Sequence, residues 1–327
     1  MPAAVPADDV TVVVVTWQGR HLLGPCLDSL RAQTAAHRVL VVDNASTDGT
    51  AEFLAAEHPG VRVHVLEQNT GFAGGMARAL EAVDTPFVAL LNNDATADPG
   101  WLAALLEHVH RHPEAAAVTS RMLLADRPGT TNNAGVVLLR SGHGADRGLG
   151  APATAFPAAD EVFGFSGGAA LLRTAAAREV GGFPAPFFLY YEDTDLSWRL
   201  RLRGWTVRYE PAAVVLHQHS ATVDQQSTVF AFHNERNRLL VLCRCAPAGL
   251  AARAVGRFLL TTGSLLARRL SGRPVPDVPA FRVPLRIRVL ASWVRLLPWA
   301  LRSRRAILRG ATADPAGLVR EWAGRDA

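Results

Sequence analysis

The chain alternates short apolar segments with amphipathic ones, and this alternation limits its possible folds more than any other feature. Five segments have the length and apolar character of β-strands: VTVVVVTW (10–17), RVLVVDN (38–44), VRVHVLE (61–67), PFVALL (86–91) and AAAVTS (115–120). Helical spacing of apolar residues follows the first and fourth of them, and capping residues open a helix within 46–57. Such alternation predicts an α/β fold with a mainly parallel sheet and right-handed crossovers.

The pattern loosens between about 121 and 165, where Gly, Pro and Asn recur, and this predicts a long excursion near the functional site. Regular structure returns with GGAALLRTAAAREVGGF (167–183) and a helix in EDTDLSWRLRLRGW (192–205). Two strand-like pieces, WTVRYEP (205–211) and AAVVLHQHS (212–220), complete this part of the chain.

The composition is that of a globular protein, because 49% of the 327 residues are hydrophobic and 19% are charged. Cys26, Cys243 and Cys245 form no C-x-x-C pair, which favours a reducing compartment over a disulfide framework. The opening MPAAVPADDV lacks the basic end and apolar stretch of a signal peptide. The longest apolar candidate in the C-terminal part, FLLTTGSLLA (258–267), has ten residues, against about 20 for a membrane span. These features predict a cytoplasmic protein.

The net charge of +5 conceals an uneven distribution. Residues 251–327 contain 15 Arg and four acidic residues, a net charge of +11. The other 250 residues contain 19 Arg and 25 acidic residues, a net charge of −6, and the chain has no Lys. An acidic body with a basic tail predicts two regions with different tasks, which we place at 1–235 and 236–327.

Polar side chains gather where the fourth strand ends, in LLNNDATADP (90–99). Ligands bind at the carboxyl ends of strands in open α/β sheets, and oxygen donors there suit a hard cation and its phosphates. The same residues also fit an ordinary turn, in which Asp98 caps a helix that begins at Pro99.

Two further segments have the character of a ligand site. Asp43 ends the second strand in VVDNASTDGT (41–50), where a carboxylate can accept a hydrogen bond from a pyrimidine N–H or a ribose hydroxyl. A strand–turn–helix in which Asp48 caps the helix explains residues 46–50 but leaves Asp43 without a role. The glycine-rich turn NTGFAGG (69–75) permits close backbone approach to a ligand, although it lacks the spacing of a dinucleotide fingerprint.

Taken in order, five motifs resemble those of glycosyltransferase family 2 with a GT-A fold, in its bacterial rhamnosyltransferase-like branch. They are VVDNASTDGT, NTGFAGG, NND, GFSGGAALLRTAAAREVGGF and FFLYYEDTDLSWRLRLRGW. The resemblance covers about residues 10–240 and implies a mixed, mainly parallel sheet flanked by helices, followed by a C-terminal α-helical tail.

The resemblance assigns a nucleotide-sugar donor site. Asp43 would hold the nucleotide base and Thr16 would frame it. The remaining donor-binding residues would be Asn69, Gly71, Phe72, Gly74, Asn92 and Asn93.

The resemblance also implies a divalent metal, Mg²⁺ or Mn²⁺, on the donor diphosphate. Asn92 and Asp94 occupy the outer positions of the family's D-x-D motif, and His217 would complete the metal shell. Because Asn92 replaces the first Asp, one negative charge is lost, and we expect weaker metal affinity with Asp94 as the principal anionic ligand. His219 lies nearby, and a packing or surface role for either histidine is the alternative.

For catalysis, the resemblance makes Asp193 the general base on the acceptor hydroxyl and Glu192 its supporting residue. The alternative is a solvated helix start favoured by the helix dipole. Asp195 lies four residues before Arg199, which predicts a helical ion pair instead of a catalytic role.

The tail interleaves apolar and Arg positions in LRIRVLASWVRLLPWALRSRRAILRG (285–310). This pattern suits an amphipathic helix on an anionic membrane surface, bent or divided at Pro298. Packing on the catalytic domain or on a second subunit, with a solvated Arg face, is the alternative, so a homo-oligomer stays open. Nucleic-acid binding is disfavoured, since no recognised motif accompanies the charge.

These observations lead to one functional hypothesis and two rivals. The hypothesis is an inverting, metal-dependent hexosyltransferase with its GT-A domain at 1–235 and a basic helical region at 236–327. It would move rhamnose or another sugar from dTDP-rhamnose or a UDP-sugar to a cell-wall or surface-glycan precursor, possibly lipid-linked, at the inner face of the cell membrane. The rivals are a sugar-phosphate nucleotidyltransferase and a non-catalytic sugar-nucleotide-binding protein.

Overall fold

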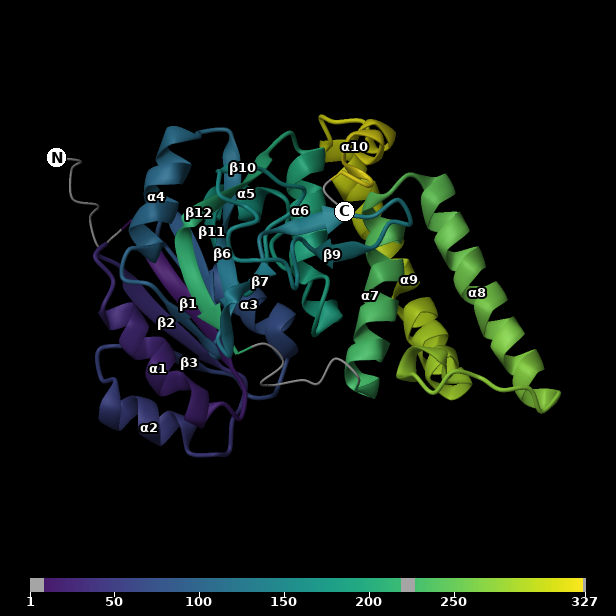
Figure 1. Ribbon diagram of the computed structural model, residues 1–327, viewed down its shortest axis with the longest axis horizontal. Helices are drawn as coiled ribbons and strands as arrows, with labels where there is room; N and C mark the ends of the chain where they lie inside the picture. Colours follow the sequence, from purple (N-terminus) through teal and green to yellow (C-terminus); the bar gives the residue numbers. More distant parts are fainter. Residues whose placement is uncertain (1–8, 219–226, 326–327) are drawn as a thin grey trace.

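The computed structural model describes residues 9–218 and 227–325. Figure 1 shows two parts side by side: a twisted sheet flanked by helices, and a group of long helices formed by the C-terminal part of the chain. The helices of the first part are α1 (Arg20–Arg31), α2 (Thr50–Glu57), α3 (Gly71–Ala82), α4 (Trp101–Arg111), α5 (Thr174–Glu179), the 3-10 turn η1 (Ala185–Phe187) and α6 (Glu192–Leu202). The C-terminal part contains α7 (Thr228–Cys245), α8 (Ala248–Leu270), the 3-10 turn η2 (Pro279–Phe281), α9 (Val283–Gly310) and α10 (Pro315–Trp322).

The main sheet is mixed. Its strands are β1 (Val10–Thr16), β2 (Arg38–Asp43), β3 (Arg62–Val65), β4 (Phe87–Leu91), β5 (Ala95–Ala97), β6 (Ala115–Leu124), β7 (Arg127–Asn133), β10 (Asp160–Glu161), β11 (Ala169–Arg173) and β12 (Thr206–His217). Among the described residues the order is β10-β12-β6-β11-β4-β1-β2-β3, with β5 paired to β12 and β7 to β6. Strands β4, β1, β2 and β3 are parallel, whereas β11 runs antiparallel to both β4 and β6. The expected α/β fold is confirmed.

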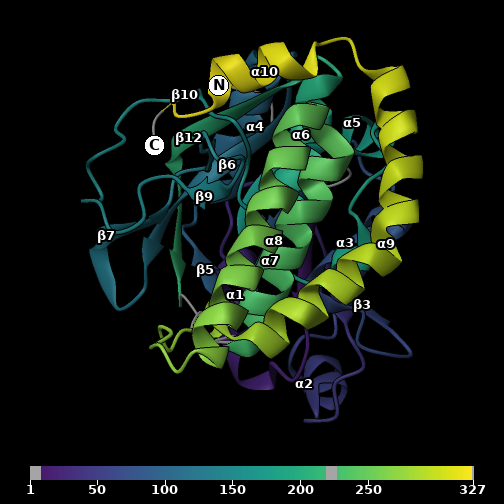
Figure 2. The same ribbon diagram turned by 90° about the vertical axis from the view of Figure 1, so that its right-hand side faces the viewer.

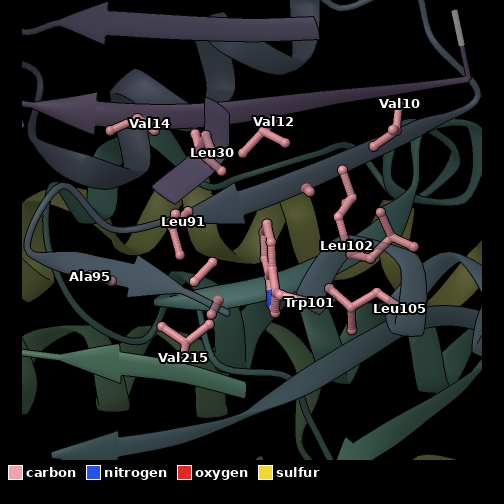
Figure 3. Packing of buried hydrophobic residues seen from close by; sticks show 14 of the residues in the cluster. Val10, Val12, Val14, Leu30, Leu91, Ala95, Trp101, Leu102, Leu105 and Val215 are labelled. Atoms are coloured by element: carbon pink, nitrogen blue, oxygen red, sulfur yellow. The ribbon is translucent and has the colours of Figure 1, made fainter. Parts of the chain in front are cut away.

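The valines of β1 explain why this strand lies at the centre of the sheet. Successive side chains point to opposite faces, so Val10, Val12 and Val14 pack with α1 and α4 while Val13 and Val15 pack with α3. Figure 3 shows Val10, Val12 and Val14 in a row above the side chains of α4. Burial on both faces requires the unbroken apolar run seen in the sequence.

The segment after residue 121 is more regular than its composition suggests. Strand β6 continues to Leu124, β7 turns back along it, and β8 (Val136–Leu138) pairs with β9 (Gly144–Asp146) in a separate two-stranded sheet. The two strand-like pieces near 210 form the single strand β12, with a register shift between Glu210 and Val214. Helix α4 begins at Trp101, two residues after Pro99, so Asp98 does not cap it.

The C-terminal helices pack against the part of the chain that contains the main sheet. One buried cluster joins Trp198 of α6 to residues of α7, α8 and α9, and it also includes Trp322. Helix α9 continues through Pro298, and Figure 2 shows its axis turning sharply part-way along, as expected of an internal proline. Part of its apolar surface packs against α7, as the alternative for this helix predicts, whereas Ile287, Val294 and Leu301 are exposed. The division at 235/236 falls inside α7 and stays a prediction.

Candidate active site

A cavity of about 710 Å³ opens at the carboxyl ends of the parallel strands. Ten of the twelve residues that the sequence assigned to the site line it: Thr16, Asn69, Gly71, Phe72, Asn92, Asn93, Asp94, Glu192, Asp193 and His217. Asp43 and Gly74 do not line it. The sequence order of these residues is scattered, and the sheet topology brings them together because β1, β4 and β12 point to the same edge.

On the donor side, the ends of β1 and β4 are joined through their side chains. Asn93 Nδ2 donates a hydrogen bond of 3.0 Å to Thr16 Oγ1. A Cβ atom on Gly19 would lie 2.4 Å from Asn93 Nδ2 and 2.5 Å from Thr16 Oγ1, so this contact requires glycine. Gly19 was not among the expected site residues, and its only signal was its position directly after the first strand.

Asp43 lies beside the cavity. It pairs in register with Thr16 and is fully buried. Its Oδ1 accepts a hydrogen bond from the backbone N–H of Ser46, whereas its buried Oδ2 accepts none from the described residues. An unpaired buried carboxylate oxygen is costly unless a ligand donor reaches it, which fits the expected role in holding a base or ribose.

The glycine-rich turn contacts protein as well as the cavity. Gly71 has φ +70°, and a Cβ there would lie 2.2 Å from the carbonyl oxygen of Phe188. A Cβ on Gly74 would lie 2.5 Å from Thr70 Oγ1. The close approach that Gly71 permits is therefore to the Phe188 segment, and Gly74 serves the packing at the start of α3.

The pairing of β5 with β12 brings His217 to Asp94. Its register places His217 opposite Ala95, the residue after Asp94, and the backbone N–H of Gln218 donates to the Asp94 carbonyl at 2.9 Å. As a result His217 Nε2 lies 3.1 Å from Asp94 Oδ1. The sequence separates these residues by more than a hundred positions. His219 lies outside the described residues.

The partners of His217 fix its tautomer. Its Nδ1 lies 2.8 Å from Asn132 Oδ1, and since an amide oxygen can only accept, Nδ1 carries the proton. In the neutral ring, Nε2 then presents a lone pair towards Asp94 Oδ1, which accepts no hydrogen bond from the described residues. The two atoms lie 3.1 Å apart, a spacing at which both could ligate one cation. Asn132 supplies the outer support typical of a metal-binding histidine.

This arrangement fits a divalent cation held by few protein atoms. Among the described residues, no three His, Cys, Asp or Glu side chains form a complete metal site. Mg²⁺ commonly binds one or two carboxylates and completes its shell with substrate phosphates and water. Asn92 presents its Nδ2 to His217 Nε2 at 3.4 Å, so its amide acts as a donor in this structure.

Asp193 and Glu192 begin α6 and line the same cavity. Asp193 Oδ2 accepts from the backbone N–H of Gly167 at 3.0 Å, and its Oδ1 accepts from Thr194. Burial raises the pKa of Asp193 above its usual value against the effect of these bonds. Burial, followed by the adjacent Asp193 charge, raises the pKa of Glu192 well above its usual value.

The backbone before this pair is strained. Phe188, Tyr190 and Tyr191 all have positive φ, between 67° and 69°, a region that non-glycine residues rarely adopt. Asn237 of α7 holds this stretch: its Nδ2 donates to the carbonyl oxygens of Phe187, Leu189 and Tyr190 at 3.0, 2.7 and 2.8 Å. Asn237 is fully buried. No sequence pattern pointed to it, since its importance depends on where α7 packs.

Asp195 has a structural role, as expected. Its Oδ2 lies 2.7 Å from Arg199 Nε, and its Oδ1 lies 2.6 Å from Arg244 Nη1. All three side chains are buried. The predicted helical pair is confirmed, and Arg244 extends it into a link between α6 and α7.

Residues 11–181 match Glycosyl transferase family 2, and the chain belongs to this family. The family to which this chain belongs shows that it is a glycosyltransferase. The chain is 32% identical over 253 residues to N-acetylglucosaminyl-diphospho-decaprenol L-rhamnosyltransferase of Mycobacterium tuberculosis, covering 69% of this chain and 82% of that protein. The expected rhamnosyltransferase-like branch is confirmed.

Solved structures confirm the GT-A fold. The mannosyltransferase PcManGT from Pyrobaculum calidifontis, in complex with GDP-Man and Mn²⁺, matches with a TM-score of 0.52 and 19% identity, covering 98% of this chain and 81% of that one. S. aureus TarS 1–349 in complex with UDP-GlcNAc matches with a TM-score of 0.55 and 16% identity, covering 92% of this chain and 89% of that one.

Proposed function

We propose that this protein is an inverting glycosyltransferase that moves a sugar, with rhamnose favoured, from a nucleoside-diphosphate donor to a lipid-linked cell-wall precursor. The observation that carries the proposal is that Asp94, His217 and Asp193 line one and the same cavity. The name of the M. tuberculosis relative supports a rhamnosyl donor and a diphospho-polyprenol acceptor.

The proposal includes a divalent cation, Mg²⁺ or Mn²⁺. Asp94 Oδ1 and His217 Nε2 would hold it. Asn92 could be a third ligand only if its amide were rotated so that Oδ1 took the place of Nδ2. When bound, such an ion would neutralise charge on the departing diphosphate. The Mn²⁺ in the related mannosyltransferase structure supports this assignment.

Asp193 would act on the acceptor. A sugar hydroxyl is a poor nucleophile, and a positioned base typically contributes about 10²–10⁴-fold to the rate. Asp193 would take the hydroxyl proton as the acceptor oxygen bonds to the anomeric carbon, and the bond to the nucleoside diphosphate would break on the opposite face. Its bond from Gly167 fixes the carboxylate, and a protonated Glu192 would avoid a second negative charge beside it.

The nucleotidyltransferase alternative gains no support from the loop after β1. That class needs a phosphate-binding loop rich in Gly and basic residues there, but Gly19 packs against Asn93 and the Arg20 backbone N–H donates to Asp48.

We also propose that the protein binds an anionic membrane surface from the cytoplasmic side. No helix in the described part of the chain has the length and hydropathy needed to span a bilayer. Helix α8 stands at the outer edge of the molecule, with exposed leucines at Leu259 and Leu260 beside Arg253 and Arg257. Such a face suits interfacial binding, in which apolar side chains insert and Arg contacts lipid phosphates.

The decisive experiment compares the wild type with Asp193→Asn. A panel of dTDP- and UDP-sugars is first screened for thermal stabilisation with Mn²⁺, since a bound donor raises stability with its saturation. Transfer to a polyprenyl-diphosphate-linked sugar is then measured. We expect Asp193→Asn to keep donor binding and to lose about 10²–10⁴-fold in turnover.

The pH profile of the wild type provides a second readout. Because the base must be deprotonated and burial raises the pKa of Asp193, activity should rise with pH along a limb displaced above that of an ordinary aspartate. Near-normal turnover of Asp193→Asn would remove it from the mechanism.

A further inference from the structure

A second cavity, also of about 710 Å³, lies among the C-terminal helices. Its walls come from the end of α8, the connection through η2 and the start of α9. Four arginines line it: Arg269, Arg273, Arg282 and Arg288. Arg282 is paired with Asp277 at 3.1 Å, the one acidic residue in the lining. The other three make no ion pair with the described residues, so the cavity carries an uncompensated positive charge.

This cavity has a fixed frame. Arg286, only 5% exposed, lies behind it on α9 and ties its walls together. It donates to Thr262 Oγ1 at 2.8 Å and the Phe258 carbonyl at 3.0 Å in α8, and to the Ala280 carbonyl at 2.9 Å in η2. Its guanidinium lies 3.8 Å from the centre of the Phe258 ring. The packing of α8 on α9 therefore fixes the backbone segments that carry the four exposed lining arginines.

The arginine-lined cavity lies next to the candidate active site. Ser227 and Val229, at the start of α7, line the active-site cavity, and Thr228 between them lines the second one. Figures 1 and 2 both place the end of α8 and the beginning of α9 at the same end of the helical group. The first turn of α7 thus separates the two cavities, and its helix dipole adds positive potential there.

Apolar side chains flank the arginines. Leu270, next to Arg269, is 80% exposed, and Val278, next to Asp277, is 44% exposed. Ile287, beside Arg288, is also exposed. Strongly basic walls with exposed apolar residues beside them match a ligand that combines a phosphate group with a hydrocarbon chain.

We infer that this cavity binds the diphosphate of a lipid-linked acceptor, with the prenyl chain leaving over Leu270 and Val278. The inference rests on the proposed function, which places the acceptor sugar at Asp193, one sugar unit from such a diphosphate. Arginine is suited to the task because its planar fork donates two parallel hydrogen bonds to phosphate oxygens.

The test is a direct titration that requires no turnover. Farnesyl diphosphate, inorganic pyrophosphate and farnesol are each titrated into the full chain by calorimetry in EDTA. The variant is Arg269→Ser with Arg273→Ser, and the matched control is Arg302→Ser with Arg305→Ser, two exposed arginines near the other end of α9. We expect farnesyl diphosphate to bind at least about tenfold more weakly to the first variant and within about twofold of wild type to the control.

The outcomes separate the possible ligands. Equal affinity for pyrophosphate and farnesyl diphosphate would show a site for free diphosphate and overturn the lipid assignment. Equal affinity for farnesol and farnesyl diphosphate would show that the diphosphate contributes nothing and overturn the diphosphate assignment. Equal losses in both variants would show a general charge effect and overturn the site. If the wild type transfers sugar and the KM for a diphosphate-linked acceptor is unchanged in the first variant, the inference fails while the proposed function stands. If the wild type transfers no sugar, the titration still shows whether the cavity binds a prenyl diphosphate.

Discussion

At the scale of single residues, the most unusual feature of the site is the amide at position 92. Asn92 occupies a position where the family's D-x-D motif has an acid, and its Nδ2 faces His217 Nε2. A neutral amide at this position adds no negative charge to the ligands of a cation beside Asp94. The candidate metal site therefore has one carboxylate and one imidazole from the protein.

We predict that Asn92→Asp strengthens metal binding, because it adds a second carboxylate beside Asp94. The Mn²⁺ concentration for half-maximal activity should fall by about tenfold, and calorimetric Mn²⁺ titration should follow it. Asn93→Asp is the matched control, since it adds the same charge on a side chain that faces Thr16. An unchanged metal requirement in Asn92→Asp, or equal gains in both variants, would contradict this reading.

Asn237 is the second residue whose role is specific. Its three hydrogen bonds hold backbone carbonyls immediately before Glu192 and Asp193. A strained segment persists only when its surroundings fix it. We therefore assign Asn237 as a positioning residue for Asp193.

We predict that Asn237→Ala lowers kcat by about 10²-fold with little change in donor KM, because a small displacement of the base is enough. The matched control is Thr85→Val, which removes a buried hydroxyl that bonds Thr11 and the Phe87 carbonyl and lines neither cavity. Equal loss of kcat in both variants, or a loss that follows the fall in Tm alone, would show that Asn237 only supports the fold.

At the scale of elements, the C-terminal helices α8 and α9 carry both buried and exposed apolar side chains. Helix α9 buries Val283, Leu285 and Val289 against the rest of the protein. Helix α8 leaves Leu259 and Leu260 49% and 77% exposed. The exposed leucines of α8, like Ile287, Val294 and Leu301 on α9, suit the membrane-facing role predicted from the sequence of 285–310.

We predict that the full chain sediments with phosphatidylglycerol vesicles and less with phosphatidylcholine vesicles, and that salt weakens the binding. Leu259→Ser with Leu260→Ser should reduce the partition coefficient by about tenfold or more, since burying one leucine is worth about 1.5–3 kcal/mol. Leu149→Ser, at an exposed leucine outside the helical region, should change little. Binding that is indifferent to the α8 leucines would remove this face from consideration.

At the scale of the whole molecule, the catalytic part and the tail share one interior. Trp198, Leu240 and Trp322 belong to the same buried cluster. Arg244 of α7 pairs with Asp195 of α6, and the Gly324 backbone N–H donates to the Leu138 carbonyl at 2.8 Å. Contacts of this kind couple the stability of the two regions.

We predict a single cooperative unfolding transition in urea, with coincident curves from far-UV circular dichroism and tryptophan fluorescence. Arg244→Met should shift the whole transition by about 3–5 kcal/mol, because it leaves the buried Asp195 with one partner in place of two. Arg305→Met is an exposed control and should leave the transition in place. Two separate transitions would show that the tail folds independently.

The sequence by itself determined the local elements and the chemistry available to them. The valines of β1 required a strand buried on both faces, and the run of motifs from Asp43 to Asp193 indicated the family. Ten of the expected site residues line the cavity because the ends of parallel strands must share one edge of the sheet. Local sequence patterns reveal the elements and the motifs, because both depend on residues that are neighbours in the chain.

Only the tertiary structure decided which distant groups meet. The register of β5 on β12 set the approach of His217 to Asp94, and the packing of α7 brought Asn237 to the strained segment before Glu192. In the Gly- and Asn-rich stretch after 121, β7 pairs with the end of β6, and β8 pairs with β9. None of these contacts has a periodic signal, because each depends on how elements far apart in the chain pack together.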